Sequence, residues 1–304
     1  MRTLRRIMAT VSRLCSRKAL AIGVLSLAVV PAAYAWEETP RLRVNYLAYP
    51  VDWNGKTIMI GSRLQLPLGA TGKLPAVILL HGTSGVSYRG VYYAAALNRV
   101  GIATLEVDQW GGRDLPGVAS SRPKSNGALL PDVAGAYHLL SERPEIDSAR
   151  IGLMGSSMGA GETMLMMTHR NSDALLGKGV HFKAAVAFYP ICWRFNEVPG
   201  ADFTDLVDAP IRIFVGDADD YDGGQAACET LLRELAPADA SHLSLRAFVG
   251  ATHEFDVFDG PREFYDPGAN RRQGGTVHVR PDPQAREQAR DDLTQFFAVA
   301  LRQQ

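Results

Sequence analysis

Between residue 73 and residue 301 the chain alternates short apolar runs with stretches of helical periodicity. The apolar runs are rich in β-branched side chains and end at glycine or proline, which predicts strands buried on both faces at residues 73–80, 101–107, 150–154, 183–188, 211–215 and 243–248. The intervening stretches predict helices at residues 88–99, 130–142, 158–169, 225–235 and 284–301. Such alternation predicts a doubly wound, mostly parallel α/β sheet covered by helices on both sides. Residues 42–47 and 56–66 predict an antiparallel opening to this sheet.

Composition agrees with a single globular unit. The chain is 46% hydrophobic and 21% charged, which is enough apolar material to bury a full core. No linker, repeat or change in composition interrupts residues 36–304, so we expect one domain there. The 32 basic and 32 acidic side chains cancel, which removes the electrostatic case for binding nucleic acid.

The first 35 residues have the pattern of a signal peptide. Six basic and no acidic side chains accompany a mostly apolar run at residues 19–30 and a small-x-small ending at Ala35. The run would span only about 18 Å as a helix, short of the ~30 Å hydrocarbon core of a bilayer. We therefore expect removal of residues 1–35, export to the periplasm or the exterior, and no stable membrane anchor. The remaining chain has 26 basic against 32 acidic side chains, a formal charge of −6.

A candidate nucleophile lies between one predicted strand and the next predicted helix, in Gly155-Ser156-Ser157-Met158-Gly159. This G-x-S-x-G pattern in a strand–turn–helix context is a nucleophile elbow, in which the glycines permit a tight turn that strains the serine backbone. A serine hydroxyl attacks only when a base takes its proton and a third group orients that base. Ser157 is therefore the predicted nucleophile, and two partners should follow it in the sequence.

Those partners are expected after later strands, the acid first and the histidine last. His253 alone of the seven histidines lies on a loop directly after the last predicted strand, so it is the predicted base. Four aspartates crowd the loop after residues 211–215. Asp219, three positions beyond the glycine that ends the strand, is the predicted acid, and Asp220 is the alternative.

The tetrahedral intermediate of such a reaction needs hydrogen-bond donors for its oxyanion. One predicted donor is the backbone N–H of Met158, just after the nucleophile. The other comes from the loop after His81-Gly82, where Thr83 is preferred and Ser84 is the alternative. His81 itself is expected to be structural.

Two cysteines remain after residue 35, Cys192 and Cys228. One follows the strand at residues 183–188 and the other lies in the helix after the strand at residues 211–215. Consecutive parallel strands are commonly neighbours, so both cysteines should lie over one edge of the sheet. Export supplies an oxidising environment, and we therefore expect a disulfide between them, with two unpaired thiols as the alternative.

Several segments together resemble the dienelactone hydrolase family of α/β-hydrolases. The resemblance extends over nearly the whole chain from residue 36, and it rests on Leu79-Leu80-His81-Gly82, Asp108-Gln109-Trp110-Gly111-Gly112-Arg113, Arg150-Ile151-Gly152-Leu153-Met154-Gly155, Gly216-Asp217-Ala218-Asp219-Asp220 and Gly250-Ala251-Thr252-His253-Glu254-Phe255-Asp256. It implies the α/β-hydrolase fold, the triad Ser157, Asp219 and His253, and neither metal nor organic cofactor. It also implies hydrolysis of a small ester or lactone through an acyl-enzyme.

The chain departs from the enzymes that give this family its name. They use a cysteine nucleophile where this chain has Ser157, which favours a broader serine esterase. They also hold a substrate carboxylate with arginines, and Arg113 is the candidate for that role here, with an ordinary surface or structural arginine as the equal alternative. An acyltransferase and a serine peptidase remain alternatives on the same fold, and a non-catalytic binding protein is the least favoured, because all three triad candidates are present. The oligomeric state is left open.

Overall fold

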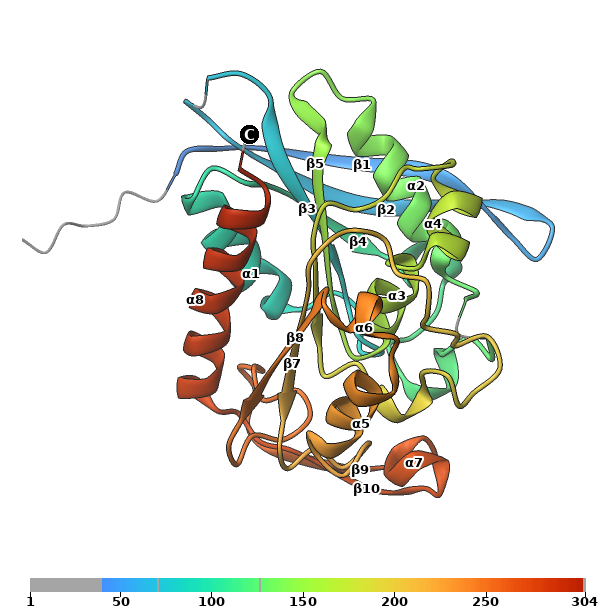
Figure 1. Cartoon of the computed structure of the whole chain (residues 1–304). Helices are drawn as coiled ribbons and strands as arrows, with labels where there is room; N and C mark the ends of the chain where they lie inside the picture. The colour runs from blue at the N-terminus through green and yellow to red at the C-terminus, as the bar shows by residue number, and fades with distance from the viewer. Residues whose placement is uncertain (1–39, 70, 126, 303–304) are drawn as a thin grey trace, which may run out of the picture. The chain divides into compact units, whose positions relative to one another are not determined.

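The computed structural model describes residues 40–69, 71–125 and 127–302, so the predicted leader at residues 1–35 lies outside the described part. The strands of the main sheet are β1 (Leu42–Trp53), β2 (Lys56–Pro67), β3 (Leu74–Leu80), β4 (Ala103–Asp108), β5 (Ile146–Ser156), β6 (Ala185–Phe188), β7 (Ile211–Gly216) and β8 (Leu243–Phe248). They are ordered β1-β2-β4-β3-β5-β6-β7-β8 (Figure 1). β1 pairs antiparallel with β2 and β2 with β4, whereas the other pairs are parallel. The doubly wound α/β fold predicted from the sequence is confirmed.

Helices cover both faces of this sheet. Their bounds are α1 (Tyr88–Arg99), α2 (Leu130–Ser141), α3 (Met158–Met166), α4 (His169–Leu175), α5 (Ala226–Glu234), α6 (Pro237–Ala240), α7 (Ala269–Arg272) and α8 (Pro283–Ala300). Short 3-10 turns add η1 (Gly111–Arg113), η2 (Ala119–Ser121) and η3 (Cys192–Arg194). α1 and α8 lie on one face, and α2, α3 and α5 supply the core of the other (Figure 1). Among the described residues, none of these helices combines the length and the apolar run needed to cross a membrane.

β3 illustrates why the central strands are continuous apolar runs. Successive side chains of a strand point to opposite faces, so a strand covered on both sides needs an apolar residue at every position. Ala76, Ile78 and Leu80 accordingly lie in the core under α2 and α3, whereas Val77 and Leu79 lie in the core under α1 and α8. All five are essentially inaccessible to solvent. Burial on both faces holds the central strands in place. The loops that carry the candidate site residues leave from the carboxyl ends of these strands.

One sequence prediction needs correction, and one segment has elements that the sequence did not predict. The helix expected at residues 158–169 is two helices, because the side chain of Thr168 accepts the N–H of Asn171 and begins α4 as an N-cap. After His253, where the sequence predicted no element, β9 (Arg262–Asp266) and β10 (Gly275–Val279) form an antiparallel hairpin with α7 between them. Its strands are short and largely polar, and their apolar alternation is too weak to be recognised from sequence.

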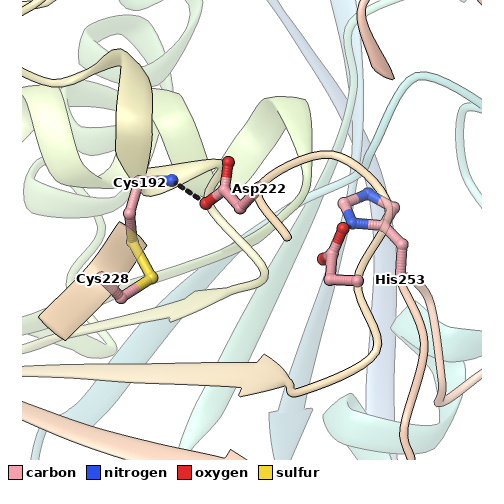
Figure 2. The surroundings of a disulfide bond; sticks show 5 residues. Cys192, Asp222, Cys228 and His253 are labelled. Carbon is pink, nitrogen blue, oxygen red and sulfur yellow. Dashed lines mark hydrogen bonds and ion pairs between the residues drawn. A yellow bond between two sulfur atoms is a disulfide. The ribbon is translucent and has the colours of Figure 1, made fainter. Parts of the chain in front are cut away.

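The disulfide predicted between Cys192 and Cys228 is present. Cys192 begins η3, just beyond β6, and Cys228 lies in α5, which follows β7. β6 and β7 are neighbours in the sheet, so the two cysteines meet over the same edge, with their Cα atoms 4.9 Å apart. Figure 2 shows the bond and its surroundings.

Candidate active site

Ser157 occupies the sharp turn between β5 and α3. Its backbone has φ 53° and ψ −110°, a conformation that costs energy for a residue with a Cβ. The neighbouring glycines are required by contact: a Cβ on Gly155 would lie 2.2 Å from the carbonyl oxygen of Gly159, and a Cβ on Gly159 would lie 2.7 Å from that of His81. The N–H of Ser157 donates to the carbonyl of Phe188 at 2.9 Å, which ties the turn to β6.

His253 lies on the loop after β8 and is almost completely buried. Its Nε2 is 2.9 Å from the Oγ of Ser157. The imidazole packs between the rings of Tyr189 and Tyr221, with centroid separations of 4.7 and 4.4 Å. The two rings therefore fix the plane of the imidazole and exclude water from it.

The structure brings Asp219 to the other side of this imidazole. Its Oδ2 lies 2.7 Å from Nδ1 of His253, and its Oδ1 accepts the N–H of Tyr221 at 2.9 Å. Burial lowers the pKa of His253, but the charge of Asp219 and its hydrogen bond outweigh burial, so the pKa lies above its usual value. Asp220, the alternative acid, instead accepts the backbone N–H of His278 at 2.8 Å. Ser157, His253 and Asp219 thus form one chain of hydrogen bonds.

The two residues predicted to supply oxyanion donors line the same cavity as Ser157. Met158 is the first residue of α3, where backbone N–H groups have no partner within the helix. Thr83 and Met158 both line the cavity that contains Ser157, and the Thr83 carbonyl accepts the indole N–H of Trp110 at 2.8 Å. Ser84, the alternative to Thr83, is exposed and lies outside the cavity lining.

His81 is buried behind this loop in a structural role, as predicted. Its Nε2 accepts the backbone N–H of Gln109 at 3.0 Å, and its Nδ1 lies 2.7 Å from the carbonyl oxygen of Gly82. Burial lowers its pKa, so the ring is neutral and can accept one of these bonds while donating the other. His81 thereby ties the Gly82 loop to the end of β4.

Of the two roles expected for Arg113, the structure contradicts substrate binding and supports the structural one. Its guanidinium is buried against Asp132, with nitrogen–oxygen distances of 2.8 and 2.9 Å. It also donates to the carbonyl of Gln109 at 2.8 Å and stacks over Trp53 at 4.1 Å from the ring centroid. Through its two terminal nitrogens and its stacked face, Arg113 joins η1 to α2 and β1, and it is not part of the cavity lining.

A cavity of about 420 Å³ opens over Ser157. Its walls come mainly from residues 119–125, from α3, from η3 and its flanking residues, and from residues 267–272 of the hairpin. The lining residues are Thr83, Ala119, Arg122, Pro123, Lys124, Ser125, Ser157, Met158, Gly161, Glu162, Leu165, Pro190, Ile191, Trp193, Arg194, Phe195, Ala201, Tyr221, Pro267, Gly268 and Arg272.

Positive charge dominates this lining. Of its four basic residues, Arg122 pairs with Asp266 at 2.7 Å, whereas Lys124, Arg194 and Arg272 form no ion pair among the described residues. Burial and the nearby charges of Arg272 and Arg122 lower the pKa of Arg194 to about 10, so it is still protonated at neutral pH. The acid in the lining, Glu162, is buried, and its pKa rises to about 8, so it is mostly uncharged there. No motif joins these cations in the sequence.

A buried cluster of charged side chains, which the sequence analysis did not predict, packs against the loop that carries His253. Arg89 of α1 donates to the hydroxyl of Tyr189 at 2.9 Å and lies 3.5 Å from a carboxylate oxygen of Glu254 and 3.7 Å from one of Asp256. Asp256 also accepts the hydroxyls of Tyr93 and Tyr189, at 2.8 and 2.7 Å. The signal for it was the presence of acids at residues 254 and 256 within an otherwise apolar stretch.

Comparison with known proteins agrees with this fold. The family model described as "Dienelactone hydrolase family" matches residues 117–301. Two uncharacterized proteins of Mycobacterium tuberculosis are 28% identical over 163 residues, which is 51% of this chain and 56% of theirs. The chain thus spans little more than half the length of these relatives.

Three solved structures share the architecture. A dienelactone hydrolase-like promiscuous phosphotriesterase from metagenomic libraries has a TM-score of 0.62 at 17% identity, over 86% of this chain and 99% of that one. The dienelactone hydrolase of Anabaena variabilis has a TM-score of 0.57 at 21% identity, over 85% and 99%. Esterase 2 of Thermogutta terrifontis, phosphorylated by paraoxon, has a TM-score of 0.58 at 15% identity, over 86% and 95%.

Proposed function

Since this chain belongs to the dienelactone hydrolase family of α/β-hydrolases, we propose that it is a carboxylic ester hydrolase that works through an acyl-enzyme on Ser157. The observation that carries the proposal is the hydrogen-bonded chain from Ser157 through His253 to Asp219, with the serine held at positive φ over an open cavity. This geometry supports nucleophilic attack, because the base lies within hydrogen-bond reach of the hydroxyl and the acid orients the base.

In acylation, the Oγ of Ser157 attacks the ester carbonyl carbon while Nε2 of His253 takes the hydroxyl proton. The carbonyl π electrons move to the oxygen, and in this proposal the backbone N–H groups of Met158 and Thr83, both in the cavity lining, stabilise its negative charge. When the carbonyl re-forms, the bond to the alkoxy oxygen breaks, and protonated His253 gives its proton to the departing alcohol. Water then repeats the cycle on the acyl-enzyme, releasing the acid and restoring Ser157.

The cavity lining further supports an ester or lactone that carries an acidic group away from the scissile bond. Lys124, Arg194 and Arg272 have no carboxylate partner among the described residues, and Glu162 is mostly uncharged at neutral pH. A substrate carboxylate would supply the missing negative charge through charged hydrogen bonds. In this proposal Arg194 is the principal contact, because it is the most shielded of the three.

A Ser157→Ala variant tests the reaction. Loss of the nucleophile should reduce the hydrolysis of p-nitrophenyl esters by on the order of 10⁴–10⁶-fold. A fluorophosphonate probe should label the unaltered protein and fail to label the variant. Retention of most of the esterase activity in the variant would end the proposal, and preferential transfer of the acyl group to an added alcohol would favour the acyltransferase alternative.

We also propose export, with removal of residues 1–35. The basic and then apolar pattern ending at Ala35 supports it, and the disulfide between Cys192 and Cys228 suits an oxidising compartment. Fractionation of cells that express the full chain, with mass determination of the product, tests this. A protein that begins at Trp36 outside the cytoplasm is the expected result, and an intact chain inside it would contradict export.

A further inference from the structure

A second carboxylate lies behind the acid of the triad. Asp222 is only 3% exposed, and in Figure 2 it lies between the disulfide and His253. One oxygen, Oδ2, accepts the backbone N–H of Cys192 at 2.5 Å. The other, Oδ1, is buried without a hydrogen-bond partner, and Asp222 forms no ion pair with any described residue.

The loop after β7 is wound so that it presents two carboxylates in different directions. The carbonyl oxygen of Asp219 accepts the N–H groups of both Gly223 and Gly224 at 3.0 Å. Gly224 has φ +82°, and a Cβ there would lie 2.2 Å from the carbonyl oxygen of Asp217. This tight turn directs the Asp219 side chain to His253 and the Asp222 side chain to η3.

A buried carboxylate without a partner cation is costly unless a positive charge lies close enough to repay the lost hydration. The charges that face Asp222 are Asp219, which repels it, and two that attract it, Arg194 and His253 when protonated. Burial and the repulsion of Asp219 raise the pKa of Asp222 to about 7, although the N–H of Cys192 opposes this rise. Of the two cations, His253 is the one that gains its charge within each cycle of the proposed reaction, when it takes the proton of Ser157.

We propose that Asp222 is a positioning residue of this site, whose negative charge stabilises protonated His253 and whose carboxylate holds the η3 wall of the cavity. The inference rests on the proposed function. When His253 takes the proton of Ser157 it becomes a cation, and the negative charge of Asp222 attracts this cation without direct contact. The same carboxylate holds Cys192, the first residue of η3, which carries Trp193 and Arg194 into the lining.

An Asp222→Asn variant separates charge from shape. The amide keeps an oxygen for the N–H of Cys192 and nearly the same volume, but it removes the charge. The other charges that face His253, namely Asp219, Glu254 and Arg89, are unchanged. The acid limb of kcat/KM should therefore move to lower pH by on the order of 0.5–1 unit, and the plateau rate should fall about threefold to tenfold.

Asp220→Asn is the matched control, because it removes the same charge from the same loop. That carboxylate binds the backbone N–H and Nδ1 of His278, at 2.8 and 3.1 Å, and it does not contact the triad. The acid limb of the kcat/KM profile of Asp220→Asn should coincide with that of the unaltered enzyme. Equal profiles for Asp222→Asn and the unaltered enzyme, or equal shifts in the two variants, would overturn the proposal.

A titration without substrate keeps the test decisive if Asp222→Asn fails to fold. In the Ser157→Ala protein, the ring nitrogens of His253 can be followed by NMR between about pH 5 and 9. Interacting groups titrate in two macroscopic steps, so the His253 signals should record a second step from Asp222. A single step would overturn the proposal. Because no turnover is needed, failure of the proposed hydrolase activity would leave this result interpretable.

Discussion

Arg194 provides the sharpest test of the substrate proposal. Its guanidinium lines the cavity, has no carboxylate partner among the described residues, and is crowded by the like charges of Arg122 and Arg272. An Arg194→Met variant keeps the apolar stem of the side chain and removes its charge. We expect this change to weaken selection for acidic esters while leaving neutral esters largely unaffected.

The size of the expected loss in kcat/KM follows from the partial burial of Arg194. Two unit charges about 4 Å apart attract by about 4 kcal/mol at an effective dielectric constant near 20. Dehydration of the substrate carboxylate and ordering of the side chain cancel roughly half of that, which leaves about 2 kcal/mol, within the range for hydrogen bonds to charged groups. The variant should therefore lose about 30-fold in kcat/KM for an acidic ester.

The assay compares p-nitrophenyl hydrogen adipate with p-nitrophenyl hexanoate, whose acyl chains have equal length and differ in the terminal carboxylate. The ratio of their kcat/KM values should fall about 30-fold in Arg194→Met. Lys124→Met is the control, since that exposed lysine also lines the cavity and its loss should change the ratio only slightly. An equal decrease for both esters in Arg194→Met, or the same change in both variants, would refute the reasoning.

Three further predictions concern the triad base, the buried charges and the disulfide. Because Asp219 raises the pKa of His253 despite burial, the acid limb of kcat/KM should lie above about pH 6.5, and a limb at or below pH 6 would contradict this. Arg89→Met leaves buried Asp256 without its cation and Glu254 with Arg262 alone, and it should cost about 3–5 kcal/mol in the free energy of unfolding by urea; a loss under about 1 kcal/mol would count against it. Replacing Cys192 and Cys228 by serine should cost about 4 kcal/mol for a separation of 36 residues, and reduction of the disulfide should give the same loss in the same experiment. Unchanged stability in both cases would refute that estimate.

Much of the fold could be predicted because its signals are local. Each buried strand is a continuous apolar run and each helix has its own periodicity, so α1 was predicted at its observed bounds and β8 likewise. The elbow around Ser157 was equally readable, since the glycines that it requires are two residues away on either side. Even the disulfide followed from the rule that consecutive parallel strands are neighbours.

The errors and omissions concern groups whose partners are distant in sequence. Whether Arg113 faces a substrate or a buried carboxylate depends on Asp132, which only the packing of α2 brings within 2.8 Å. The cavity cations come from separate segments around residues 122, 194 and 272, and no spacing along the chain relates them.

The chain by itself therefore determined the sheet, the tight turn at Ser157 and the order of Ser157, Asp219 and His253 along the sequence, because backbone sterics and burial on two faces are encoded by near neighbours. Only the tertiary structure decided which aspartate of one loop meets His253 and which two meet His278 and Cys192. The three carboxylates differ by at most three positions in sequence, and the turn closed by Gly223 and Gly224 points them to different partners. Such directions depend on contacts between distant segments, which a linear pattern does not record.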